Sequence, residues 1–181
     1  MMENISLFLK ALHFAADKHR GQRRKDESAS PYINHPIYVA QILSDIAGID
    51  DVEVLCGAIL HDTVEDTETS LNDIELAFGL RVARIVEEVT DDKSLAKDAR
   101  KQAQIDHASH ISREGALVKV ADKVANIRDV ASNPPSDWST KRRKEYLDWA
   151  EEVVTNCKPE SPELLSYFED SLGSARKGID S

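Results

Sequence analysis

The sequence predicts an all-α protein, folded as one bundle of about eight to ten helices. Apolar residues recur at spacings of three and four along most of the chain, which is the period of an amphipathic helix. No alternating strand pattern of useful length occurs, and neither Asn-Gly nor Asp-Gly hairpin turns are present. With 181 residues, of which 41% are hydrophobic, the chain suits one globular domain with a real core over residues 1–181.

The expected helices follow this period in chain order. They lie near residues 5–16, 36–46, 52–60, 71–78, 82–89, 116–130, 138–154 and 162–172, the last two within a C-terminal helical region of residues 138–175. Segment 52–60 is apolar nearly all round and is expected to be a central, buried helix. The polar loops 22–30 and 132–137 are expected to serve function, as long loops in compact domains often do.

Capping and helix-breaking residues mark several of these boundaries. Pro36 stands at an expected first helical position, where its missing N–H is tolerated. Ser70 and Asp73 have the spacing of a capping box. Gly79 is expected to end the helix that this box begins.

Composition excludes several classes of protein. Lys and Arg number 23 against 33 Asp and Glu, and the net charge of −10 repels nucleic acid and anionic lipid. Two cysteines, Cys56 in an apolar run and Cys157, are too few for a disulfide scaffold, so a reducing compartment, the cytoplasm, is expected. No signal peptide is evident, and no run approaches the roughly 20 apolar residues of a membrane span.

The dipeptide His61-Asp62 is the most informative point in the sequence. It ends an apolar run, where an unpaired imidazole and carboxylate would be costly and a bound cation would compensate both. Asp122 lies in a similar apolar stretch, and His35 stands directly before Pro36. Together these two imidazoles and two carboxylates form a ligand set suited to Mn, Fe or Zn.

Each of these residues also has a purely structural interpretation. A lone buried His is usually a hydrogen-bonded core residue, and Asp122 alone could pair with Lys119 or Lys123. The occurrence of all four candidates in apolar or helix-start settings favours the metal. The histidines that lack such a setting, and are expected to be surface or structural residues, are His13, His19, His107 and His110.

Two more carboxylates, Glu65 and Asp66, follow closely. On a helix, positions 62, 65 and 66 share one face, where three carboxylates repel one another unless a cation or donor is near. One interpretation is that Asp62 binds metal while Glu65 and Asp66 orient water. The alternative is a solvated acidic helix end.

A polar stripe runs along the otherwise apolar segment 116–130. Its members are Lys119, Asp122, Asn126 and Asp129. Spacings of three and four place them on one helix face, which is expected to line a cleft rather than the core.

Basic residues gather in three clusters despite the acidic balance, at 19–25, 97–101 and 141–144. Near a metal, such clusters suit a polyphosphate substrate, although ordinary solvated helix ends give the same pattern. Trp138 and Tyr146 flank the third cluster. They are suited either to stacking on a base or to packing in the core.

Five segments in this order, KHRGQRRK, PYINHP, ILHDTVEDT, EVTDDKSL and VKVADKVANIRDV, resemble the HD-domain hydrolases of the RelA/SpoT type. The resemblance covers roughly residues 5–155 and is strongest to the stand-alone small alarmone hydrolases of the metazoan SpoT-homolog type. A bare His-Asp dipeptide is a weak signal, whereas five ordered motifs are specific.

The resemblance implies an HD-domain fold and an enzyme dependent on one Mn²⁺ ion. It implies removal of the 3′-pyrophosphate of guanosine tetra- or pentaphosphate (ppGpp or pppGpp), giving GDP or GTP. The implied metal ligands are His35, His61, Asp62 and Asp122, and Glu65 and Asp66 are implied to position the attacking water. The implied substrate contacts are Arg24, Lys25, Lys97, Asn126, Arg142 and Tyr146.

Two departures leave the substrate open. The long bacterial enzymes add a synthetase domain and a regulatory tail, and they usually have Thr where this chain has Asp129. The stand-alone branch is also associated with removal of the 2′-phosphate of NADPH, which is the alternative function. A third possibility is a module that binds nucleotide without cleaving it, and retention of all four ligands disfavours it. The sequence does not indicate an oligomeric state.

Overall fold

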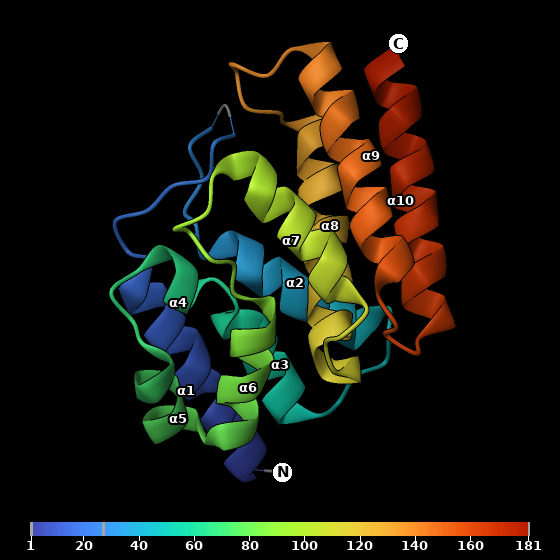
Figure 1. Cartoon of the computed structure of the whole chain (residues 1–181). Helices are drawn as coiled ribbons and strands as arrows, with labels where there is room; N and C mark the ends of the chain where they lie inside the picture. The colour runs from blue at the N-terminus through green and yellow to red at the C-terminus, as the bar shows by residue number, and fades with distance from the viewer. Residues whose placement is uncertain (1, 27, 181) are drawn as a thin grey trace.

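The computed structural model describes residues 2–26 and 28–180 and confirms the all-α prediction (Figure 1). In chain order, the helices are α1 (Met2–Lys18), α2 (Asn34–Asp45), α3 (Val52–Leu60), α4 (Thr63–Asp66), α5 (Leu71–Phe78), α6 (Leu80–Val89), α7 (Lys97–Ala108), α8 (Arg113–Ser132), α9 (Thr140–Asn156) and α10 (Pro162–Asp180). Within the described ranges there is no strand, and Arg23 and Pro31 form one isolated antiparallel bridge.

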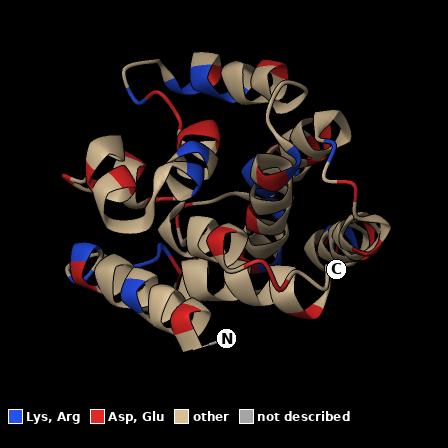
Figure 2. Cartoon of the chain, turned by 90° about the horizontal axis from the view of Figure 1, so that it is seen from below, with Lys and Arg blue, Asp and Glu red and all other residues tan. Residues whose placement is uncertain are grey.

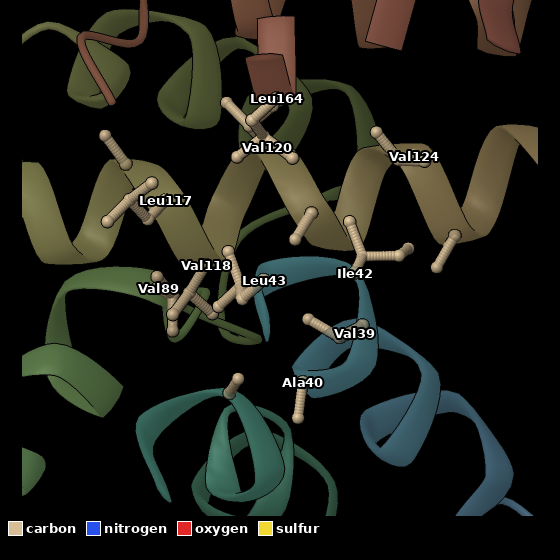
Figure 3. Packing of buried hydrophobic residues seen from close by; sticks show 14 of the residues in the cluster. Val39, Ala40, Ile42, Leu43, Val89, Leu117, Val118, Val120, Val124 and Leu164 are labelled. Atoms are coloured by element: carbon tan, nitrogen blue, oxygen red, sulfur yellow. The ribbon is translucent and has the colours of Figure 1, made fainter. Parts of the chain in front are cut away.

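Helix α8 lies at the centre of the bundle, in contact with α2, α3, α6, α9 and α10. Its side chains Val118 and Val120 are fully buried, and Figure 3 shows Val118 beside Leu43 of α2 and Val120 beside Leu164 of α10. Helix α3 is buried on most of its surface, as its apolar composition predicts. Three of the four expected metal ligands belong to these two helices: Asp122 lies within α8, and His61 and Asp62 follow α3 directly.

The expected caps around α5 are present. Ser70 accepts from the backbone N–H of Asp73, and the Asp73 side chain accepts from the backbone N–H of Ser70. Gly79 ends α5 with a φ of +92°, a conformation that suits glycine, and α6 begins at the next residue. Cys56 is buried in the core as expected, and Cys157 is also buried and free.

Several expected boundaries were wrong. Helix α2 begins two residues before Pro36, so that proline is the third helical residue rather than the first. Ser139 caps α9, which begins at residue 140 rather than 138, and α10 continues to residue 180 instead of ending near 172 or 175. Helix α7 was not predicted at all, because its sequence is largely polar and only Ala108 is buried.

The two long polar loops lie near each other. In Figure 1, the loop before α2 runs along the upper left of the molecule and the loop before α9 lies at the top, and residues of both line one cavity. Figure 2 shows acidic and basic residues distributed over most of the helices rather than gathered on one of them. Among the described residues, no helix is long and apolar enough to cross a bilayer.

Candidate metal centre and active-site cleft

The four expected metal ligands converge from three separate stretches of the chain. His35 is the second residue of α2, His61 and Asp62 form the turn between α3 and α4, and Asp122 lies in the middle of α8. Nε2 of His35 is 3.1 Å from Oδ1 of Asp122, and Nε2 of His61 is 3.0 Å from Oδ2 of Asp62. The distances from Nε2 of His35 to Oδ2 of Asp62 and from Nε2 of His61 to Oδ1 of Asp122 are both 3.8 Å. The chain therefore builds a compact N/O cluster.

The environment of His61 suits a metal ligand. Its Nδ1 lies 2.7 Å from the carbonyl oxygen of Ala58, which makes Nδ1 the donor and leaves Nε2 as the atom that would bind a cation. Among the described residues, this buried Nε2 has no hydrogen-bond partner, although Asp62 is close. Ligand atoms from His35, His61 and Asp62 lie within 4.8 Å of one another. A divalent cation would satisfy these groups together.

The charges of the cluster depend on one another. Burial lowers the pKa of His61, but Asp62 and Asp122 outweigh it and raise that pKa to about 9. Burial raises the pKa of Asp122, whereas Lys123 and His35 bring it well below its usual range. Burial lowers the pKa of His35 and keeps its imidazole neutral. A shared proton thus compensates the carboxylates here, which is the role a cation would take over.

Neighbouring side chains hold the two candidate carboxylate ligands in place. The hydroxyl of Tyr32 donates to Asp62 at 2.6 Å, and Nδ2 of Asn126 donates to Asp122 at 2.6 Å. Nζ of Lys123 lies 3.3 Å from the other oxygen of Asp122. Sequence reasoning missed Tyr32 as a site residue. Its only signal was its place three residues before His35, in the same short motif.

Glu65 and Asp66 lie on the short helix α4, beside the cluster. Oε2 of Glu65 accepts from the backbone N–H of Asp91 at 3.1 Å. Burial, followed by the charge of Asp91, raises the pKa of Glu65 to about 7. Asp66 accepts from Tyr32 and forms an ion pair with Lys93. The two carboxylates therefore differ: Glu65 is placed to exchange a proton near neutral pH, whereas Asp66 is already paired.

The cluster opens into a series of adjoining cavities. A cavity of about 190 Å³ contains the four candidate ligands together with Glu65, Asp66 and Lys119. The next, of about 290 Å³, is lined by Arg24, Lys25, Asn126, Trp138 and Tyr146 among others. A third, of about 220 Å³, is lined by Lys97, Arg100, Lys101 and Arg142 and shares Trp138 and Tyr146 with the second. All six expected substrate contacts thus line these adjoining cavities, together called the cleft.

Arg24 is more heavily engaged than its expected role suggests. Its Nη2 donates to Asn126 at 2.8 Å and to Asp129 at 2.7 Å, and only 17% of its side chain is exposed. Asp129, a member of the expected polar stripe, therefore neutralises this guanidinium. Its partner lies 105 residues away in the chain, so no local sequence pattern revealed the pair.

The third basic cluster divides between the cleft and the surface. Arg142 lines the cleft with its guanidinium 4.5 Å from the ring centre of Trp138. Lys141 is 86% exposed, and Lys144 pairs with Asp180. Trp138 and Tyr146 pack with their ring centres 5.4 Å apart. The aromatic pair forms part of the cleft wall and also packs against the core.

The remaining histidines lie outside the cluster, as expected. His19 is buried, stacks on Tyr32 and hydrogen-bonds Gln22, so its role is structural. His13, His107 and His110 are exposed.

The fold and the His-Asp cluster are those of an HD-domain protein, and the HD domain family matches residues 11–148. The chain belongs to this family. It is 54% identical over 158 residues to the Xenopus tropicalis protein named guanosine-3′,5′-bis(diphosphate) 3′-pyrophosphohydrolase MESH1, covering 87% of this chain and 88% of that one. The human protein of the same name is 53% identical over 164 residues, with 91% and 92% covered.

A solved structure is similar along almost the whole chain. It is described as a metazoan ortholog of SpoT that hydrolyzes ppGpp, and it matches with a TM-score of 0.90 and 44% identity over 96% of each chain. The bifunctional (p)ppGpp synthase/hydrolase SpoT of Escherichia coli is 35% identical over 148 residues, which are 78% of this chain and 20% of that protein. The resemblance inferred from the motifs is thereby confirmed, and the cluster suggests a divalent metal.

Proposed function

We propose that this chain is a Mn²⁺-dependent enzyme that removes the 3′-pyrophosphate of ppGpp and pppGpp, releasing pyrophosphate with GDP or GTP. One ion would be held by His35, His61, Asp62 and Asp122. The observation that carries the proposal is the buried Nε2 of His61, without a hydrogen-bond partner among the described residues and beside two carboxylates. The printed activity of the 53–54% identical relatives supports the choice of substrate.

In this mechanism the chain orients the reactants and moves one proton. A bound divalent cation supplies Lewis acidity, which lowers the pKa of a water and polarises a phosphoryl oxygen. Glu65 accepts the proton of the attacking water, and Asp66 orients that water. The water oxygen bonds to the phosphorus on the 3′ oxygen, the bond between that phosphorus and the 3′ oxygen breaks, and the 3′ oxygen takes up a proton.

The cleft supplies the groups that hold a polyphosphate. Lys25, Lys97 and Arg142 line it with positive charge, and Arg24 adds a guanidinium fixed by Asp129. Asn126 already bonds Asp122, which supports a role for it in contacting the substrate beside the metal cluster. Tyr146, which borders both outer cavities, would pack against the nucleoside.

The direct test is incubation with ppGpp and Mn²⁺, with and without a chelator, followed by detection of pyrophosphate and GDP. We expect turnover with Mn²⁺ and none with chelator. His61→Ala should lose both Mn²⁺ binding and turnover, whereas the matched control His110→Ala, at an exposed histidine, should retain both. Glu65→Gln should bind Mn²⁺ normally and lose a factor on the order of 10²–10⁴ in kcat. Cleavage that persists without metal would contradict the proposal.

Removal of the 2′-phosphate of NADPH is the second candidate. The aromatic wall of Trp138 and Tyr146 favours it as much as ppGpp, because an aromatic ring stacks on any base. Competition of the two nucleotides for one preparation decides between them: the one with the higher kcat/KM is the preferred substrate. Tight nucleotide binding with no Mn²⁺-dependent product would instead indicate the binding module.

We also propose that the enzyme acts in the cytoplasm, on a free nucleotide and not on nucleic acid or a membrane. The two buried, free cysteines and the net charge of −10 support this proposal.

A further inference from the structure

Asp91, the second residue after α6, contacts Glu65 through its backbone. Its amide N–H donates to Oε2 of Glu65 at 3.1 Å, which ties the loop after α6 to the short helix α4. The Asp91 side chain is only 13% exposed and lines the cavity that contains the metal cluster. One residue thus places both a hydrogen-bond donor and a negative charge near Glu65.

Two further helices hold Asp91 in this position. From α7, Nε2 of Gln104 donates to Oδ2 of Asp91. From α8, Nζ of Lys119 donates to the carbonyl oxygen of Val89 at 3.0 Å and lies 3.9 Å from Oδ1 of Asp91. The Lys119 side chain is 9% exposed. Burying an ammonium group is unfavourable unless its partners are well placed. The buried Lys119 therefore depends on the Val89 carbonyl and the Asp91 carboxylate, and in turn it holds this loop in position.

We propose that Asp91, held by Gln104 and Lys119, is a positioning residue for Glu65. Its N–H fixes one carboxylate oxygen of Glu65 so that the other is available to a water, and its carboxylate strengthens Glu65 as a proton acceptor. This inference rests on the role of Glu65 in the proposed function. It adds the residues, from α7 and α8, that make Glu65 effective.

The electrostatics around Glu65 agree with this geometry. Burial raises the pKa of Glu65 to about 7, and the largest charge contribution is that of Asp91. The other titratable groups that act on Glu65 are Asp62 and Asp66, from its own turn and helix, and Lys119 from α8. A general base works best with a pKa near the operating pH, so a neighbouring carboxylate that is unfavourable for stability is useful for proton transfer.

Asp91→Asn is the sharpest variant, because it keeps the backbone N–H and an oxygen acceptor for Gln104 while it removes the charge. We expect the pKa of Glu65 in metal-free protein, measured by carboxyl NMR, to fall by at least about half a unit. In a plot of kcat against pH, the acidic limb should likewise move to lower pH. Asp91→Ala, which loses the acceptor as well, should lower kcat on the order of tenfold with KM within about twofold. The control Asp92→Asn, at an exposed neighbour, should change neither quantity.

The double variant Glu65→Gln with Asp91→Asn separates positioning from general destabilisation. If Asp91 acts through Glu65, the double variant should be no slower than Glu65→Gln alone. Should Asp91→Ala fail to fold, the NMR titration and kcat profile of Asp91→Asn decide.

An unchanged Glu65 pKa together with an unchanged kcat in Asp91→Asn would overturn the inference. The proposed function would survive that result as long as Glu65→Gln is still inactive. A fully active Glu65→Gln would instead remove the proposed role of Glu65, and with it this inference.

Discussion

The phenol oxygen of Tyr32 lies 2.6 Å from Oδ2 of Asp62 and 3.0 Å from Oδ2 of Asp66. The ring stacks on His19 with centres 4.7 Å apart, and Gln22, which bonds His19, also donates to the backbone oxygen of Asp66. Burial and Asp62 both raise the pKa of Tyr32, so the hydroxyl remains a donor. One buried phenol therefore links a candidate metal ligand to a candidate water-positioning residue, and its single proton serves only one of them at a time.

Replacing Tyr32 by Phe should weaken Mn²⁺ binding about tenfold or more. Removal of the hydroxyl leaves the Asp62 carboxylate without the donor that orients it, and the loss of such a partner typically costs 10–100-fold in metal affinity. Titration of Mn²⁺ by calorimetry measures the change. Tyr167→Phe, at a tyrosine on α10 remote from the cluster, is the control. Unaltered affinity in Tyr32→Phe would show that Asp62 is held adequately by other groups.

Arg142 and Lys141 are adjacent but should differ in their effect on substrate binding. Arg142 lines the cleft against Trp138, whereas Lys141 is 86% exposed and pairs with Glu145 on its own helix. Loss of a phosphate contact in the cleft should raise the KM for ppGpp about tenfold in Arg142→Ala, given the 1.5–3 kcal/mol of a charged hydrogen bond and partial screening. Lys141→Ala should leave KM within about twofold. Steady-state kinetics at two salt concentrations test this. Equal changes of KM in the two variants would mean that substrate binding depends on the net charge of the protein and not on a contact with Arg142.

Much of the fold and most of the cluster could be predicted from sequence, for a physical reason. Segment 52–60 and the capped helix after Ser70 were predicted well because burial and capping are local constraints that leave a local pattern. The metal cluster was predictable because a polar His61-Asp62 pair in an apolar run requires a partner. Helix α7 was missed because its burial is slight and its stability depends on packing against α9.

The parts of the site that were missed depend on tertiary contacts. Asp91 contacts Glu65 through its backbone N–H, a group that every residue except proline has, so residue type carries no signal. Arg24 was identified as basic, but its neutralisation by Asp129 required the loop between α1 and α2 to be placed relative to α8. Lys119 belonged to an expected polar stripe, and only the structure shows that it donates to the carbonyl oxygen of Val89.

The raised pKa of Glu65 should make the metal-free protein less stable as pH rises. The folded-state pKa is about 7, against 4.5 for an ordinary Glu, so the folded protein binds the proton more tightly than the unfolded chain. Stability should therefore fall as pH rises from about 4.5 to 7 and then level off. Glu65→Gln removes this penalty without removing the acceptor for the Asp91 N–H.

In chelator-treated protein, we expect Glu65→Gln to be more stable than the parent above pH 7, by roughly 1–2 kcal/mol after allowance for partial exposure. That corresponds to a rise in Tm of about 2–8 °C, and the difference should vanish at pH 4. Thermal unfolding across the pH range measures it. A constant difference at every pH would indicate a packing effect rather than the ionisation of Glu65.

Gly57 should tolerate no larger side chain, even though it lies inside a helix. Gly→Ala in a helix interior normally stabilises a protein by about 1 kcal/mol. Here, a Cβ atom at position 57 would lie 2.6 Å from Cγ2 and 3.2 Å from Cβ of Ile85, atoms too close to the α6 backbone to move away cheaply. The resulting strain, about 2–3 kcal/mol at so close an approach, exceeds the helix-propensity gain, so Gly57→Ala should lower Tm by several degrees.

Gly173→Ala is the matched control, because it lies inside α10 and its added Cβ would meet nothing within 4 Å. It should raise Tm slightly. In a double-mutant cycle, Gly57→Ala combined with Ile85→Ala should be less unstable than the sum of the single variants, since the smaller side chain at position 85 makes room for the new methyl group. If the two losses of stability simply add, the new methyl group is accommodated by a separation of α3 and α6 and not by the space at position 85. In that case Mn²⁺ affinity should fall as well, because His61 follows the end of α3 directly.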